Sequence, residues 1–185
     1  VTGVYDGDTI VLEDGRCVRY IGINTPETAH PPKVAEPFGN EARKANQALV
    51  YRKKVRLEFD HERFDRYGRH LAYVFLENDT FVNLSLIEKG VAYCLPRYPN
   101  LRFARVFLTT QRRAMTAARG IWRDWPRPPK REKLVGNRRS RRFHRSTCPY
   151  GRKTGERHRQ VFSNRWDAFW AGFAPCGQCI KTLRD

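Results

Sequence analysis

The strongest constraint on the fold is a pair of strand patterns at the start of the chain, joined by a turn of two residues. Residues 1–13 read VTGVYDGDTIVLE, in which apolar and polar side chains mostly alternate. Such alternation is typical of a strand with one buried face. Asp14-Gly15 is a common two-residue hairpin turn, and residues 16–23 resume the strand pattern. The sequence therefore predicts that the chain begins as an antiparallel hairpin.

The segments that follow predict a mixture of strands and helices. Apolar residues recur with helical spacing in 40–52, 83–89 and 101–119, whereas 55–60 and 69–76 have strand patterns. Strands that come first, with helices interleaved later, favour an α+β fold that is mainly a small β barrel with helices packed around it. An up-and-down sandwich is the alternative.

We predict three parts along the chain: a folded unit over 1–122, a linker over 123–136 and a basic Cys/His module over 137–185. The linker prediction depends on the sequence DWPRPPKREKLVG, which has three prolines, many charges and few residues to bury. A second polar, proline-rich loop is expected over 26–37, inside the first unit.

The charge of the chain indicates a polyanionic partner. The formal net charge is +17, and thirteen of the 36 Lys and Arg residues lie in 127–159 against two Asp and Glu. This excess favours DNA, RNA or an acidic membrane surface as the partner. No stretch approaches the roughly 18 apolar residues that a membrane span needs. A monomer is favoured, and a secreted or envelope-associated location is expected if a signal segment preceded Val1.

Carboxylates and arginines stand at the ends of the strand patterns. Asp6-Gly7-Asp8-Thr9 interrupts the first pattern, Asn24-Thr25-Pro26-Glu27 follows the second, and Arg69 opens a later one. Arg19 lies inside the apolar run VRYIGI, where burial is costly without an anionic partner. Each feature alone fits a turn, a helix start or a surface residue. Together they are the groups that phosphodiester hydrolysis needs: cation ligands, a carboxylate base and phosphate-binding arginines.

The same segments, in the same order, resemble one known family. They read VYDGDTIVL, VRYIGINTPET, EPFGNEA, DRYGRHLAYV, VNLSLIEKGVA and the closing ARGIW. Over residues 1–122 the chain resembles the staphylococcal nuclease (thermonuclease) family. The resemblance implies a five-stranded OB-fold barrel capped by helices. It also implies calcium-dependent hydrolysis of DNA and/or RNA by an endonuclease.

The resemblance also implies a role for each motif residue. Asp8 matches the main calcium-binding aspartate, and Thr25 matches the residue whose backbone carbonyl helps to hold the cation. Glu27 matches the glutamate that positions or deprotonates the attacking water. Arg19 and Arg69 match the two arginines that grip the phosphate and stabilise the transition state.

Asn24 stands where the family has a second calcium aspartate. An amide oxygen can bind a hard cation but adds no negative charge, so we expect weaker cation binding or a shifted metal preference. Tyr98 matches a tyrosine that stacks on the nucleotide. Asn24 favours the alternative of a nucleic-acid-binding module that does not cut, whereas the retention of the arginines and Glu27 favours the enzyme. A basic protein aimed at membranes would leave the carboxylates unexplained.

The last part of the chain contains a pattern of metal ligands. His144 precedes Cys148 by four residues, and Cys176 precedes Cys179 by three. Two ligand pairs separated by a loop are the usual arrangement of a structural zinc site. A small hydrophobic module with incidental cysteines is the alternative. The segment also resembles the zinc module of the bacterial alkylation-response protein Ada. Because His144 replaces the methyl-accepting cysteine, the resemblance implies zinc and DNA-backbone binding without methyl transfer.

Overall fold

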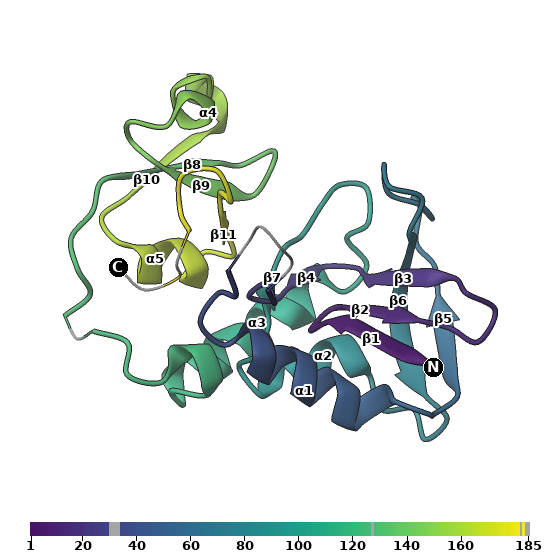
Figure 1. The fold of residues 1–185 in the computed structure, drawn as a ribbon. Coiled ribbons are helices and arrows are strands. Elements are labelled where there is room, and N and C mark those ends of the chain that lie inside the picture. Colours follow the sequence, from purple (N-terminus) through teal and green to yellow (C-terminus); the bar gives the residue numbers. More distant parts are fainter. Residues whose placement is uncertain (30–33, 127, 182, 184–185) are drawn as a thin grey trace.

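The first sheet is built from the strand patterns near the start of the chain. The computed structural model describes residues 1–29, 34–126, 128–181 and 183. Residues 30–33 of the predicted loop over 26–37 therefore lie outside the described residues. The strands of this sheet lie in the order β1-β2-β3-β6-β5 (Figure 1). They are β1 (Gly3–Asp6), β2 (Thr9–Val11), β3 (Cys17–Tyr20), β5 (Val55–Glu58) and β6 (His70–Leu76).

The pattern over 1–13 forms two strands instead of one. β1 and β2 pair as an antiparallel hairpin whose turn is Gly7-Asp8, so the Asp14-Gly15 turn joins the second and third strands. The turn is held in place because both acids bond to residues 25–28: Asp6 accepts hydrogen bonds from Thr28, and Asp8 accepts one from the Thr25 amide. The interruption noticed in the sequence is thus a turn that carries two carboxylates.

The five strands form an open ladder. β3 and β6 pair in parallel, whereas the other neighbours are antiparallel. Within the described residues no strand pairing joins β1 to β5, so the predicted closure into a barrel is not seen as a continuous ladder. A separate two-stranded ladder joins β4 (Ile23–Asn24) to β7 (Tyr93–Cys94). The prediction of a five-stranded sheet with helices packed on it is confirmed.

Three helices pack against the first sheet. They are α1 (Gly39–Val50), α2 (Val82–Glu88) and α3 (Ala104–Thr116), each inside or next to its predicted range, with a short η1 (Gly120–Trp122) after them. The core between helices and sheet includes fully buried Val18, Val74 and Leu86. Among the described residues, no helix combines the length and apolarity that crossing a membrane requires.

A second, four-stranded sheet forms the C-terminal module. Its order is β10-β8-β9-β11. The strands are β8 (Leu134–Asn137), β9 (Arg142–Arg145), β10 (Arg159–Phe162) and β11 (Ala174–Pro175). The helices are α4 (Pro149–Arg152), η2 (Glu156–His158) and α5 (Arg165–Trp170). Because β8 begins at Leu134, which is fully buried, the last residues of the predicted linker (123–136) belong to this sheet.

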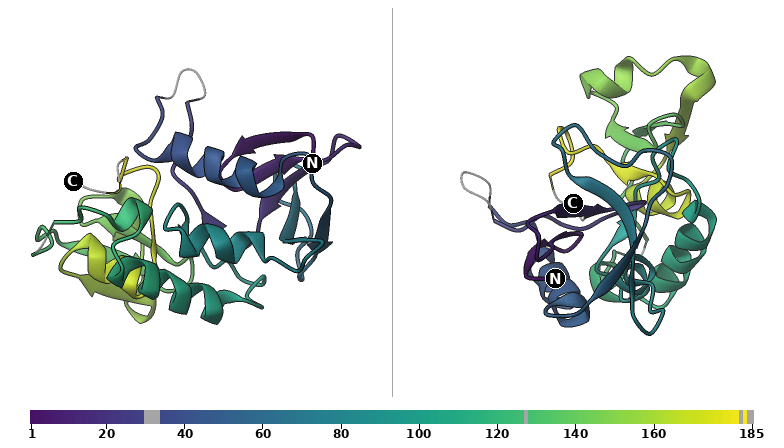
Figure 2. Two further views of the ribbon diagram at one scale, coloured as in Figure 1. Left: turned by 90° about the horizontal axis from the view of Figure 1, so that it is seen from below. Right: turned by 90° about the vertical axis from the view of Figure 1, so that its right-hand side faces the viewer.

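The two units share one hydrophobic core. Phe169 of α5 lies edge-on to Tyr93 and Trp122 of the N-terminal unit, with ring centroids 5.4 and 5.1 Å apart. Trp125, which the sequence assigned to the linker, is buried against the same ring. Two views in Figure 2 show the module beside the N-terminal unit, and α3 contacts α5. The segment after η1 is therefore partly structural instead of a free linker.

Removing the Phe169 ring is expected to destabilise both units together. Phe169 is fully buried, so Phe169→Ala should lower the free energy of unfolding by about 3–5 kcal/mol. The neighbouring Trp170 is 40% exposed, so Trp170→Ala should cost less than about 1 kcal/mol. Chemical denaturation followed by tryptophan fluorescence and circular dichroism measures both. Separate transitions for the two units in the wild-type protein would contradict the shared core.

Candidate functional site

Asp8 lies at the turn between β1 and β2 and is buried. Its Oδ2 accepts a hydrogen bond from the backbone N–H of Thr25 at 3.0 Å and lies 2.9 Å from Arg19 Nη2. Its Oδ1 accepts from the Thr9 hydroxyl at 3.0 Å. The carboxylate is therefore fixed in place by three different segments of the chain.

Arg19 lies on β3 and its guanidinium contacts oxygens on several sides. Nη1 donates to the carbonyls of Tyr20 and Ile23 at 2.8 and 3.0 Å, and Nη2 donates to Asn24 Oδ1 at 2.8 Å. The Arg19 side chain is only 13% exposed, and the side chain of its ion-pair partner Asp8 is 7% exposed. The expectation that an arginine inside an apolar run has an anionic partner is confirmed.

Asn24 and Thr25 complete a set of oxygen atoms around this pair. Asn24 Nδ2 donates to the Thr25 carbonyl at 2.9 Å and to the Tyr93 hydroxyl at 2.8 Å, which fixes the orientation of the amide. Asp8 Oδ2 and Asn24 Oδ1 both lie within 3 Å of one Arg19 nitrogen, so a positive charge already lies between them. A carboxylate, an amide oxygen and a backbone carbonyl are ligands that suit a hard cation. These residues fit an oxygen-bound cation, with a single negative charge among them.

Glu27 lies in the loop after β4 and reaches the surface. Partial burial of the carboxylate raises the pKa of Glu27 above its ordinary value, and the charges of Asp8 and Asp6 raise it further. Its backbone is held by Glu36, whose N–H donates to the Glu27 carbonyl at 2.9 Å. The sequence assigned a role to Asp8, the second acid of Asp-Gly-Asp, but none to Asp6, the first. The structure places Asp6 with Asp8 and Glu27 in one acidic group.

Arg69 lies just before β6, on the strand beside Arg19. In the parallel ladder Arg19 pairs with Leu71. Arg69 precedes Leu71 by two residues, so its side chain lies on the same face of the sheet as that of Arg19. Arg69 bonds to Asp65 through Nε and Nη2, at 2.8 and 2.7 Å. Arg19 and Arg69 line one cavity of about 480 Å³, which we call the first cavity.

Other residues of the first cavity were not found from the sequence. Tyr67, which is 68% exposed, lies in its wall and is packed by the guanidinium of Arg69. Arg97 is also in its wall. Tyr98, the residue expected to stack on a nucleotide, lines a neighbouring cavity instead and is 82% exposed. The sequence signal for Tyr67 was its place between two arginines in DRYGR.

The four predicted zinc ligands come together in the C-terminal module. One ligand atom from each of His144, Cys148, Cys176 and Cys179 lies within 4.8 Å of the others. His144 Nδ1 and Cys148 Sγ are 3.6 Å apart. A tetrahedral zinc site with Zn–S bonds of about 2.3 Å separates its ligands by about 3.8 Å. Burial lowers the pKa of His144, and Arg142 lowers it further, so the imidazole is held in the neutral form that binds metals.

Comparisons with known proteins cover the N-terminal unit. A sequence model described as "Staphylococcal nuclease homologue" matches residues 17–124. The chain is 38% identical over 125 residues to the thermonuclease of Staphylococcus hyicus, covering 66% of this chain and 73% of that protein. It is 38% identical over 122 residues to endonuclease YncB of Bacillus subtilis, covering 63% and 57%. It is 39% identical over 122 residues to the SPbeta prophage-derived endonuclease YokF of B. subtilis, covering 63% and 41%.

The position of Glu27 depends on a glycine at the start of α1. A Cβ atom at Gly39 would lie 2.2 Å from the Glu27 carbonyl oxygen, so Gly39→Ala must displace that backbone. We expect a loss of about 1–3 kcal/mol in the free energy of unfolding. We also expect about a hundredfold loss in any activity that depends on Glu27, if the shift is about 1 Å.

The matched control is Gly155→Ala. A Cβ atom there would meet nothing within 4 Å, and the residue has an ordinary φ of −62°. Thermal unfolding and steady-state kinetics of both variants measure the difference. Equal behaviour of the two variants would show that the Gly39 contact does not position Glu27.

Proposed function

Because the chain belongs to the staphylococcal nuclease family, we propose that it is a divalent-cation-dependent nuclease that hydrolyses phosphodiester bonds of DNA and/or RNA on a barrel of the OB type. The observation that carries the proposal is the first cavity. Arg19 and Arg69 come from neighbouring strands and line it together, and Arg19 is bonded to Asp8, whose charge also acts on Glu27. Two cationic phosphate ligands beside a group of carboxylates are what in-line attack on a phosphodiester needs.

The residues divide the chemistry among them. Glu27 takes the proton from the attacking water, and its raised pKa makes it a stronger base than an ordinary carboxylate. Arg19 and Arg69 donate to the phosphate oxygens as negative charge builds up on the pentavalent phosphorus. A calcium ion held by Asp8, Asn24 and the Thr25 carbonyl would supply Lewis-acid polarisation of the phosphate.

Arg69 differs from Arg19 in how strongly it is held. Its side chain is 32% exposed and bonds to Asp65, whereas Arg19 is 13% exposed and bonds to four oxygens. A phosphate in the first cavity competes with Asp65 for the Arg69 guanidinium. Arg69 is therefore the arginine that can move toward the phosphate as its negative charge grows, whereas Arg19 stays fixed.

Asn24 supports a second candidate, a nucleic-acid-binding module that does not cut. The side-chain oxygens that would meet the cation carry one negative charge, from Asp8, and Arg19 Nη2 lies against both of them. Weak cation binding would leave a protein that holds phosphate through its arginines without activating water.

A cleavage assay separates the two candidates. The full chain is incubated with plasmid DNA and with RNA, in calcium, magnesium or manganese or with a chelator. We expect degradation that the chelator abolishes. Glu27→Gln and Arg69→Lys should each lower kcat by at least about a hundredfold, since each removes a transition-state interaction. Glu41→Gln and Arg113→Lys make the same chemical changes at exposed helix positions and should leave kcat unchanged. A folded protein that cleaves with none of the three cations would favour the binding module.

We also propose that His144, Cys148, Cys176 and Cys179 bind one structural zinc ion. The four ligand atoms already lie close enough for tetrahedral coordination. The pairs come from β9 and the turn after it, and from the segment after β11, and Cys176 N donates to the Phe143 carbonyl at 2.9 Å. Zinc would therefore hold the parallel β9–β11 edge together, in a module too small to bury a large core of its own.

Zinc removal is expected to destabilise the module. Fully reduced wild-type protein should contain one zinc ion per chain by elemental analysis, and Cys176→Ser should lose it and lower the Tm. Cys17→Ser serves as the control, because Cys17 is a free cysteine on β3, outside the cluster. Less than stoichiometric zinc in carefully reduced protein would contradict the site.

A further inference from the structure

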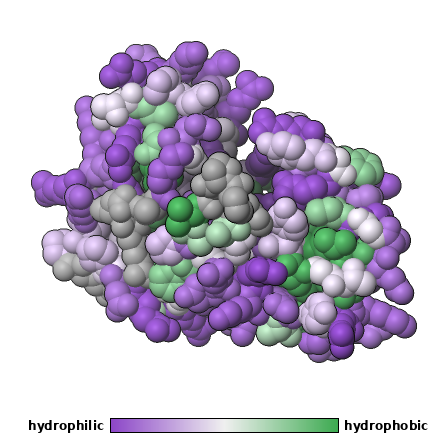
Figure 3. All heavy atoms as spheres, viewed as in Figure 1, coloured by the Kyte–Doolittle hydropathy of each residue, from purple (hydrophilic) through white to green (hydrophobic). Residues whose placement is uncertain are grey.

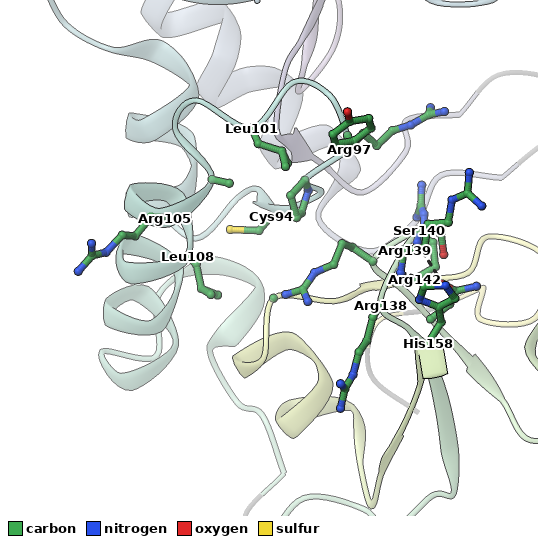
Figure 4. Close-up of a pocket in the computed structure, with 16 residues that line it drawn as sticks. Cys94, Arg97, Leu101, Arg105, Leu108, Arg138, Arg139, Ser140, Arg142 and His158 are labelled. Atoms are coloured by element: carbon green, nitrogen blue, oxygen red, sulfur yellow. Dashed lines mark hydrogen bonds between the residues drawn. The ribbon is translucent and has the colours of Figure 1, made fainter. Parts of the chain in front are cut away.

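A second cavity, of about 1230 Å³, lies between the N-terminal unit and the C-terminal module. One wall comes from residues 94–108, which run from β7 into α3, and the other from residues 137–142, which join β8 to β9. Figure 4 shows Leu101 and Leu108 on one side of the opening and Arg138 and Arg142 on the other, while the Arg105 side chain extends outward from its helix. In Figure 3, hydrophilic side chains border the notch between the two lobes. Neither unit alone makes this cavity.

The walls of the second cavity are positively charged. Among the described residues that line it, six are arginines and none is Asp or Glu. The arginines are Arg97, Arg105, Arg138, Arg139, Arg141 and Arg142. Positive charges gathered in a recess repel one another and raise the local concentration of anions. The cavity is therefore suited to a ligand with several negative charges.

Two of these arginines are fixed and four are free to bind. Arg141 donates to the Ala171 carbonyl, and Arg142 donates to the Pro175 carbonyl, each at 2.6 Å. Within the described part of the chain, the other four guanidinium groups have neither an acidic partner nor a side-chain hydrogen bond. All four, Arg97, Arg105, Arg138 and Arg139, are exposed. Unpaired arginines of this kind bind phosphate oxygens through paired N–H groups.

The rest of the lining is apolar or aromatic on the side of the N-terminal unit, whereas the module adds the polar Asn137, Ser140 and His158. Pro96, Leu101, Ala104 and Leu108 lie on the side of the N-terminal unit, with Tyr98 beside them. Tyr98 is 82% exposed and Leu101 42% exposed, so a ligand can reach both. Arginines beside exposed aromatic and aliphatic surface are the combination that binds single strands, because phosphates meet the charges while bases stack on the apolar groups.

The two cavities are neighbours, since Arg97 lines both. We propose that the second cavity binds an unpaired stretch of nucleic-acid strand that continues from the phosphate held between Arg19 and Arg69. Its volume exceeds the roughly 300–1,000 Å³ of small-molecule pockets, which suits more than one nucleotide. The strand is unpaired because the bases of a duplex face each other and cannot reach the Tyr98 and Leu101 surface. The part of this proposal that places a phosphate of the strand between Arg19 and Arg69 rests on the proposed function.

The test compares two variants that each remove two positive charges from the C-terminal module. Arg138→Ala/Arg139→Ala changes the wall of the second cavity. Arg152→Ala/Lys153→Ala changes exposed residues at the end of α4, outside the cavity. The full-length zinc-loaded protein is titrated into a labelled thymidine oligomer of about twelve nucleotides, within the range of known single-strand sites. Anisotropy is measured without a chelator, in buffer freed of calcium, magnesium and manganese beforehand, so that the zinc stays bound, the oligomer stays intact and binding is independent of catalysis.

We expect the cavity variant to bind the oligomer about tenfold more weakly and to lower the slope of log K against log salt by about 1.4, for two lost phosphate contacts. The α4 variant should change affinity by less than about twofold. Cleavage of a dinucleotide, which is too short to reach the second cavity from the phosphate between Arg19 and Arg69, should be unchanged in the α4 variant. Equal losses in the two variants, or an equal loss of duplex binding in the cavity variant, would overturn the proposal.

The result is separable from the proposed function. If the wild-type protein cleaves nothing with any cation but the cavity variant still loses single-strand affinity, the proposed function fails and this proposal stands. If the protein cleaves normally and the cavity variant binds like the wild type, only this proposal fails. Circular dichroism and zinc content confirm that both variants are folded.

Discussion

The buried ion pair between Asp8 and Arg19 is the contact on which the site depends. Asp8 belongs to the turn between β1 and β2, and Arg19 bonds from β3 to the carbonyls before and at β4. Loss of one partner would leave the other charge buried and unpaired, at a cost of about 3–5 kcal/mol. The pair and its hydrogen bonds join four segments of the chain. The contact that fixes the sheet therefore also fixes the distance between the proposed cation ligands and the proposed phosphate-binding arginine.

The shared core determines what the second unit can contribute. Phe169 packs against Tyr93, and the hydroxyl of Tyr93 accepts a hydrogen bond from Asn24. One tyrosine therefore contacts both the proposed cation site, through its hydroxyl, and the module, through its ring. Arg142 lies close enough that Arg19 and Arg97 act on its charge, although burial is the main reason that the pKa of Arg142 is lowered.

The sequence predicted the elements and the site residues that lie within short motifs. Helix periodicity located α1, α2 and α3, although not η1, and the cost of burying Arg19 pointed to an acidic partner. Leu134 was misassigned because three apolar residues among charges give no periodic signal. Arg97 and Arg142 were missed because they come together only when the two units pack, and no local pattern encodes a contact between segments so far apart.

Gln111 on α3 contacts both units with one amide. Its oxygen accepts from the Cys94 backbone N–H and its nitrogen donates to the Phe169 carbonyl, each at 2.6 Å. On the ribosome, Gln111 and Trp122 are made roughly fifty residues before Phe169, which at about 5–20 residues per second is a delay of roughly 2–10 s. Throughout this interval Gln111 lacks its hydrogen-bond partner Phe169, and the Trp122 ring lacks the Phe169 ring that covers it. The N-terminal unit can therefore complete its core only after the α5 segment has been synthesised.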